Sequence, residues 1–201
     1  LGVPGAYRIQ HNYFKLHACC LYNHPVLDGV QTLLGREKFA AADVDRIKVE
    51  APALATIMTE PEPVNMLAAK FSLPYAVATA VVHNSTDITA FYPDRLQDPT
   101  TLALSRRVEI VADPEMDLRR YDYPAAKVAI SLKDGRTLTE EVTAHHGDTE
   151  NPASREELVG KFNFLVQDVL GEEGAVRVVE TVGYLDALGN IKELTRLLKG
   201  S

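Results

Sequence analysis

The sequence changes character near residue 145, and this change limits the folds that the chain can adopt. In residues 1–145, patterns typical of short strands are mixed with patterns typical of helices, whereas in residues 146–201 apolar residues recur only at helical spacing. Strands and helices segregated in this way, rather than repeated as strand–helix–strand units, indicate an α+β fold. We therefore expect an α+β domain at 1–145 and a helical segment at 146–201.

The strand pattern is clearest at 127–142. Apolar and polar residues alternate in its first half, and an Asp-Gly pair at 134–135 favours a tight turn before the chain returns. Two shorter apolar runs, at about 44–49 and 108–111, predict further strands. Residues 6–15 mix β-branched and aromatic side chains and are predicted to be extended.

Capping residues and prolines predict where the helices begin. Ser154 and Glu157 have the spacing of a capping box, in which each side chain accepts a hydrogen bond from the main-chain N–H of the other residue. Proline in a first turn and serine just before a helix mark other starts. The predicted helices are 24–35, 72–83, 98–106, a helix from 154 through 169, and two more at about 173–188 and 190–199.

Composition narrows the classes of function. The net charge of −7 and the pI of about 5.4 argue against general affinity for nucleic acids or anionic membranes. Apolar runs fall short of the roughly 20 residues that a membrane-spanning helix needs. The two cysteines are adjacent, and a vicinal pair is a poor disulfide candidate, so we expect a cytoplasmic protein. Without an initiator methionine or a secretory signal, the chain is expected to be a piece of a longer protein.

The first candidate site lies just before the predicted helix at 24–35. Lys15 is either a solvated lysine or part of an anion site, because main-chain N–H groups and the helix dipole favour anions there. Cys20 is either a buried core thiol or a group that donates or accepts a proton. No metal site is expected, because the spacing departs from the pairs two to four residues apart that wrap one zinc ion. That spacing belongs to His17, Cys19, Cys20 and His24.

A second candidate segment runs from Lys70 to Tyr75. Lys70 precedes the predicted N-cap Ser72 and has a side chain long enough to extend toward the same anion. Tyr75 is either a packing residue or a phenol available for chemistry, in a helix otherwise made of small residues. His145 and His146 follow the predicted hairpin and are interpreted as a solvated turn.

The two segments resemble the MmgE/PrpD family, which includes 2-methylcitrate dehydratases, cis-aconitate decarboxylases and iminodisuccinate epimerases. The family pattern at the first segment is Lys-Pro-Tyr-Pro-x-Cys, then a histidine four residues on and an acidic residue in the following helix. The matching positions are Lys15, Cys20, His24 and Asp28. The pattern at the second segment is a basic residue, then Ser-x-x-Tyr and a small-residue helix. Its matching positions are Lys70, Ser72 and Tyr75.

The resemblance implies a cofactor-free lyase that moves a proton next to a carboxylate of a small di- or tricarboxylate. Lys15 and Lys70 would neutralise substrate carboxylates, because removing such a proton builds up further negative charge. Cys20 and Tyr75 would transfer protons or position the substrate. The implied catalytic residues are Lys15, Cys20 and Tyr75, and the implied substrate-binding residues are His24, Lys70 and Ser72.

Two departures from the family pattern affect the expected function. Leu16, His17 and Ala18 replace the Pro-Tyr-Pro of the first segment, which affects the rigidity of the turn. Cis-aconitate decarboxylases carry histidine where Cys20 stands, which favours a 2-methylcitrate dehydratase of propionate catabolism. The alternatives are a family epimerase or a cis-aconitate-type decarboxylase. In a different class, the alternative is a non-catalytic binding or assembly module.

The resemblance also implies an arrangement of domains. The family fold has a large helical domain, built from the amino-terminal half and the final helices, and a smaller α+β domain that closes over it. Residues 1–145 would be this lid-like domain, and residues 146–201 the helices that pack on the large one. The expected partners are therefore the amino-terminal helical half and a second copy in a homo-oligomer such as a dimer. Alone, the chain is expected to be inactive, with a tail that self-associates or folds back on the sheet.

Overall fold

The computed structural model describes residue 5, residues 7–118 and residues 125–199. The chain divides into two compact units, Leu1–Pro152 and Ala153–Ser201. The boundary therefore follows Pro152 rather than residue 145. The reason is that the loop after the hairpin folds back onto the first unit, where the Phe14 N–H donates to the Gly147 carbonyl at 2.9 Å.

A four-stranded sheet lies at the centre of the first unit, with strand order β2-β1-β3-β4. The strands are β1 (Val44–Ala51), β2 (Val108–Ala112), β3 (Ala126–Leu132) and β4 (Thr137–Val142). β1 runs parallel to β2 and antiparallel to β3, and β3 and β4 form an antiparallel hairpin. The α+β class and the strand predictions are confirmed.

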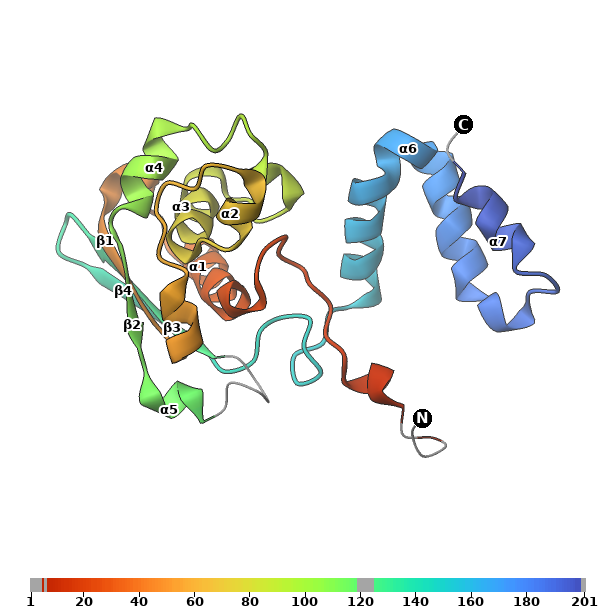
Figure 1. Ribbon diagram of the computed structural model, residues 1–201, viewed down its shortest axis with the longest axis horizontal. Helices are drawn as coiled ribbons and strands as arrows, with labels where there is room; N and C mark the ends of the chain where they lie inside the picture. Colours follow the sequence, from red (N-terminus) through yellow and green to blue (C-terminus); the bar gives the residue numbers. More distant parts are fainter. Residues whose placement is uncertain (1–4, 6, 119–124, 200–201) are drawn as a thin grey trace. The chain divides into compact units, whose positions relative to one another are not determined.

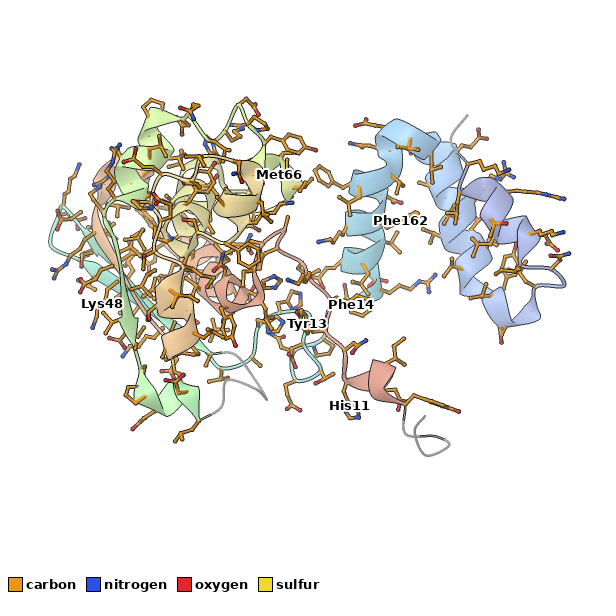
Figure 2. All side chains as sticks on the ribbon, viewed as in Figure 1. His11, Tyr13, Phe14, Lys48, Met66 and Phe162 are labelled. Atoms are coloured by element: carbon orange, nitrogen blue, oxygen red, sulfur yellow. The ribbon has the colours of Figure 1, made fainter. Side chains whose placement is uncertain are left out.

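One face of the sheet is apolar and covered by helices, and the other is charged. Helices α1 (His24–Arg36) and α3 (Leu73–His83) pack on the apolar face (Figure 1). The other face carries Lys48, which is labelled in Figure 2. Its ammonium lies 2.6 Å from the Glu50 carboxylate. This one-sided pattern is typical of sheets that are solvated on one face. The core residues of the two central strands are Val44, Ile47, Val49, Ala51, Ala126, Val128, Ile130 and Leu132.

Capping side chains set the start of two helices in this unit, as predicted. The Ser72 hydroxyl accepts from the Tyr75 N–H at 3.0 Å and begins α3. The Asp98 carboxylate accepts from the Thr101 N–H at 3.0 Å and begins α4 (Pro99–Ser105). The remaining short elements are α2 (Met66–Lys70), α5 (Pro114–Asp117) and 3-10 turns at Arg8–His11, Leu21–Asn23, Ala41–Asp43, Ala53–Ile57 and Ile88–Phe91.

The prediction of an extended segment at 6–15 is wrong for part of its length. Arg8–His11 form a 3-10 turn, and the chain from there to Cys20 has no regular secondary structure; residue 6 lies outside the described residues. Strand propensity is realised only against a partner strand. Here the main chain of Phe14 pairs with a loop glycine instead of with the sheet.

The second unit is helical, as predicted. Ser154 and Glu157 form the predicted capping box, with the Glu157 N–H donating to Ser154 Oγ at 3.1 Å. The long helix α6 (Arg155–Gly183) bends at Gly171, whose φ of 64° separates the two limbs that the sequence predicts as two helices. A 3-10 turn at Leu185–Ala187 and helix α7 (Lys192–Leu197) follow. Among the described residues, no helix combines the length and apolar character needed to cross a bilayer.

Candidate active site

Four rings gather around the start of helix α1, and we call them the ring cluster: Tyr13, His17, His24 and His145. The ring centroids of His17 and His24 are 5.1 Å apart, and those of His24 and His145 are 5.3 Å apart. Tyr13, labelled in Figure 2, lies 5.2 Å from His145, and all three pairs meet edge to face. His24 and His145 are fully buried, and His17 is 3% exposed.

Two of these rings, His24 and His145, favour the neutral imidazole. Burial, followed by the neighbouring His17 and His145 rings, lowers the pKa of His24 from 6.5 to about 2. Burial also lowers the pKa of His145, although the Asp148 and Asp28 carboxylates oppose that shift. Within the described part of the chain, the nitrogens of these two rings have no hydrogen-bond partner of acceptable geometry. Burial disfavours an imidazolium at both positions, although His145 Nδ1 lies 3.7 Å from the Asp148 carboxylate.

His17 has a partner on each side of its ring. Its Nε2 lies 2.9 Å from the Asp28 carboxylate, and its Nδ1 lies 2.6 Å from the Thr86 hydroxyl. The second Asp28 oxygen accepts from the His146 main-chain N–H at 2.6 Å. These contacts join three segments that are far apart in the sequence. Across the residues that the structure describes, no three His, Cys, Asp or Glu side chains are arranged to hold a metal ion.

Lys15, Cys20 and Lys70 belong to segments that lie side by side. The Lys15 ammonium donates to the Cys19 carbonyl at 3.1 Å. The Cys20 N–H donates to the Lys70 carbonyl at 2.9 Å, and the Asn23 side-chain amide donates to the same carbonyl at 3.5 Å. Lys15 is exposed, and Cys20 and Lys70 are partly exposed. The chain therefore brings together the segments that carry two amines and a thiol, while the chemical roles of these groups stay predictions.

Tyr75 and Ser72 make contacts of a different kind. The Tyr75 hydroxyl donates to the Ala90 carbonyl at 3.1 Å, and its ring lies 6.2 Å from the Phe91 ring. Tyr75 is fully buried, and burial raises its pKa to about 12. The Ser72 hydroxyl caps α3 and donates to the Glu60 carbonyl. Both side chains are thus engaged in the packing and capping of α3, and their predicted roles toward a substrate stay predictions.

The interpretation of the loop after the hairpin as a solvated turn is wrong for His145, which has no exposed surface. Gly147 explains this burial, because its φ of 96° and its approach to the Phe14 carbonyl leave no room for a Cβ. A glycine directly after two histidines is therefore a signal that this loop packs closely against another segment. Thr86 and Tyr13 carry no comparable local signal, and the sequence pattern does not single them out.

Comparison with known proteins yields a family match and several relatives. A family model for the MmgE/PrpD C-terminal domain matches residues 17–185. Over 165 residues the chain is 27% identical to the cis-aconitate decarboxylase of Mus musculus, covering 82% of this chain and 33% of that protein. It is 28% identical over 195 residues to the cis-aconitate decarboxylase of Aspergillus terreus, covering 92% of this chain and 40% of that protein. It is 25% identical over 192 residues to the cis-aconitate decarboxylase of Homo sapiens, covering 93% of this chain and 40% of that protein. The chain thus spans 33–40% of the length of these relatives.

Proposed function

Because the chain belongs to the MmgE/PrpD family, whose C-terminal domain matches residues 17–185, we propose that it is the carboxy-terminal portion of a lyase that acts on a small tricarboxylate. The observation that carries the proposal is the 2.9 Å bond from the Cys20 N–H to the Lys70 carbonyl. It fastens two lysine-bearing segments together beside a partly exposed thiol. Two lysines on segments that are bonded together suit a substrate with several carboxylates.

The chemistry requires positive charge near the reacting carbon. In a dehydration, a proton leaves the carbon next to a carboxylate, and a hydroxyl group departs as water from the neighbouring carbon. In a decarboxylation, the bond to CO₂ breaks and the remaining electron pair takes up a proton. Both routes build negative charge beside a carboxylate, which Lys15 and Lys70 would stabilise. Cys20 is our candidate for the group that carries the proton.

Two tricarboxylates are candidate substrates. The cysteine at position 20 favours 2-methylcitrate, since the cis-aconitate decarboxylases of the family carry histidine there. The names of the relatives favour cis-aconitate instead. Both acids offer the same chemistry to the lysines, and a direct assay with each separates them.

The test is turnover of 2-methylcitrate and of cis-aconitate by the polypeptide at its encoded length. We expect a Lys15→Ala variant to lose about 100-fold in kcat/KM on the preferred acid, because one stabilising charge is removed. Lys48→Ala is the matched control, since Lys48 pairs with Glu50 on the open face of the sheet. Equal activity of the two variants would remove Lys15 from the site. Binding of either acid without turnover would favour the non-catalytic module.

The second unit supports a proposal about the rest of the longer protein. Helix α6 exposes large apolar side chains: 51% of Leu165, 60% of Val169, 46% of Val176 and 51% of Val182. Its two limbs also border a hollow of about 250 Å³ that is lined mainly by apolar residues, among them Phe162 and Val178. Each large aliphatic side chain left in water forgoes roughly 1.5–3 kcal/mol. We propose that the amino-terminal helical half covers this surface.

This proposal predicts that the 201-residue chain self-associates when it is produced alone. Sedimentation would then give a mass above the 22.1 kDa of one chain. A Leu165→Glu, Val169→Glu double variant should return the chain to a monomer, because charges on this surface oppose its burial. Adding the amino-terminal half should replace the self-association of the unchanged chain by a complex with that half. A wild-type chain that is monomeric with α6 unfolded would contradict the proposal.

A further inference from the structure

The stretch between the Arg8–His11 turn and the start of α1 depends on long-range contacts for its shape. It carries Lys15 and Cys20, yet residues 12–20 have no regular secondary structure. Four hydrogen bonds to other segments hold its second half. The Ala18 N–H donates to the Thr86 carbonyl at 3.0 Å, the Cys20 N–H donates to Lys70, and the His17 ring bonds on both sides.

The side-chain bonds around His17 form a chain with a defined direction. A carboxylate can only accept, so a neutral His17 carries its proton on Nε2 and donates it to Asp28. Nδ1 then accepts from the Thr86 hydroxyl, and that hydroxyl in turn accepts from the Gln31 amide at 3.3 Å. Each group in this series of hydrogen bonds has a donor or acceptor that matches its neighbour.

Lys15 lies between two points at which its segment is fixed. On one side, the Phe14 N–H donates to the Gly147 carbonyl at 2.9 Å. On the other, His17 bonds to Asp28, which also accepts from the His146 N–H at 2.6 Å. Asp28 therefore connects α1 with His17 and with the loop that holds Phe14. Loss of its carboxylate would release them together.

We propose that His17, Asp28 and Thr86 form a positioning triad that holds Lys15 and Cys20 in place for the carboxylate substrate. That the triad serves a carboxylate substrate rests on the proposed function. That it holds this segment in place rests on the hydrogen bonds described above. His17 is 3% and Thr86 is 5% exposed, so water has little access to replace their bonds. Losing one such bond frees the segment to move, because local order cannot restore its shape.

The same unit contains a matched control built from the same residue types, His83, Asp98 and Thr101. His83 Nε2 lies 3.1 Å from Asp98 and 3.1 Å from the Thr101 hydroxyl, which donates to Asp98 at 2.5 Å. Asp98 and Thr101 belong to the first turn of α4 and its cap. Thr101 is fully buried, so its substitution by valine removes a comparable hydroxyl.

The experiment compares Thr86→Val with Thr101→Val in a Cys19→Ala background, where only Cys20 can be alkylated. Rates of alkylation by iodoacetamide report the local geometry of Cys20 in the folded chain. We expect Thr86→Val to change this rate about fivefold, because that factor corresponds to the loss of one net hydrogen bond. Thr101→Val should change it less than about twofold. Thr86→Ser, which keeps the hydroxyl, should restore the wild-type rate. The free energy of unfolding of both valine variants is measured in urea, so that their stabilities can be compared alongside their alkylation rates.

Two further readouts separate positioning from general destabilisation. The ¹⁵N spectrum of His17 should show the Nε2–H tautomer in both the wild type and Thr86→Val, because the Asp28 carboxylate can only accept; a changed alkylation rate with this tautomer retained indicates movement of the segment rather than of the proton. In the encoded-length protein, Thr86→Val should lower kcat/KM about tenfold, while Thr101→Val keeps it within about twofold. Alkylation rates that are equal in the two valine variants would overturn the positioning role, whatever the activity. If the wild type shows no turnover while the two valine variants still differ in alkylation rate, the proposed function is overturned and the positioning of Cys20 is supported.

Discussion

Two triads of aspartate, histidine and threonine in the α+β unit have the same chemistry and different surroundings. In the first, the side chains of His17 and Asp28 are 4% and 14% exposed. In the second, the side chains of His83 and Asp98 are 20% and 23% exposed. The first triad joins segments separated by up to 69 residues, whereas the second spans 18 residues, from the end of α3 to the cap and first turn of α4.

The difference shows that burial and sequence separation, rather than residue type, decide what such a triad contributes. Water can reach the partly exposed His83 and Asp98 side chains and replace a partner lost there, so their bonds in the second triad are worth less. A buried donor without a partner keeps its full desolvation cost. The first triad should therefore be more sensitive to substitution and to acid.

The largest expected effect is that of Asp28→Ala compared with Asp98→Ala. Asp28→Ala leaves the His17 ring and the His146 N–H without their acceptor, so we expect a loss of about 3–5 kcal/mol in unfolding free energy. Asp98→Ala removes an N-cap and should cost about 1–2 kcal/mol. Urea unfolding of both variants measures the difference. Equal losses would mean that burial does not distinguish the triads.

Gly147→Ala tests the loop that supplies the His146 N–H to Asp28. An added Cβ would collide with the Phe14 carbonyl at a φ of 96°, so we expect a loss of about 3 kcal/mol. The control is Gly135→Ala in the β3–β4 turn, where φ is 91° but the space is open. There the expected loss is about 1 kcal/mol. Similar losses for the two variants would show that the loop shifts without loosening the triad.

The parts of the fold that follow from local pattern could be predicted from the sequence. Alternation along β3, the Ser72 cap and the Ser154 capping box each depend on residues a few positions apart. The same holds for one part of the second triad, since Asp98 and Thr101 are three residues apart at a helix start. Such features need no knowledge of the rest of the chain.

The candidate site was predictable only in part, because its contacts are long-range. The segments of Lys15, Cys20 and Lys70 stand out by composition, and they do lie together. Thr86 and His145 become site residues only through bonds or ring contacts across many residues, which no local periodicity encodes. The extended prediction for 6–15 fails for the same reason, since its pairing depends on a distant loop.

Acid should destabilise the surroundings of the first triad before it affects the second. The pKa of His24 is about 2 in the folded chain and 6.5 when unfolded, so the unfolded state binds more protons between these values. Stability is therefore full above pH 6.5 and falls as the pH drops below it. From His24 alone the loss should be about 2 kcal/mol at pH 5. Unfolding measured at pH 7 and pH 5 tests this.

Two comparisons sharpen the acid prediction. Burial tends to raise the pKa of Asp98, but hydrogen bonds from Thr101 and Thr100 hold that pKa below 3.8. Stability that depends on Asp98 is therefore present above pH 3.8 and is lost only below it. His24→Asn should flatten the slope between pH 7 and pH 5, while Thr101→Val should retain it. A slope that persists in His24→Asn would assign the acid sensitivity to other groups.

The smallest expected effect concerns the outermost donor of each triad. Gln31 donates to the Thr86 hydroxyl at 3.3 Å, and an Arg95 nitrogen lies 3.2 Å from His83 Nδ1. Both side chains are exposed, so Gln31→Ala and Arg95→Ala should each cost about 0.5 kcal/mol or less. Gln31→Ala should leave His17 as the Nε2–H tautomer in ¹⁵N spectra, because the Asp28 carboxylate can only accept. A mixture of tautomers would mean that the Thr86 hydroxyl also decides where the proton lies, and it would contradict the proposed direction of the bonds.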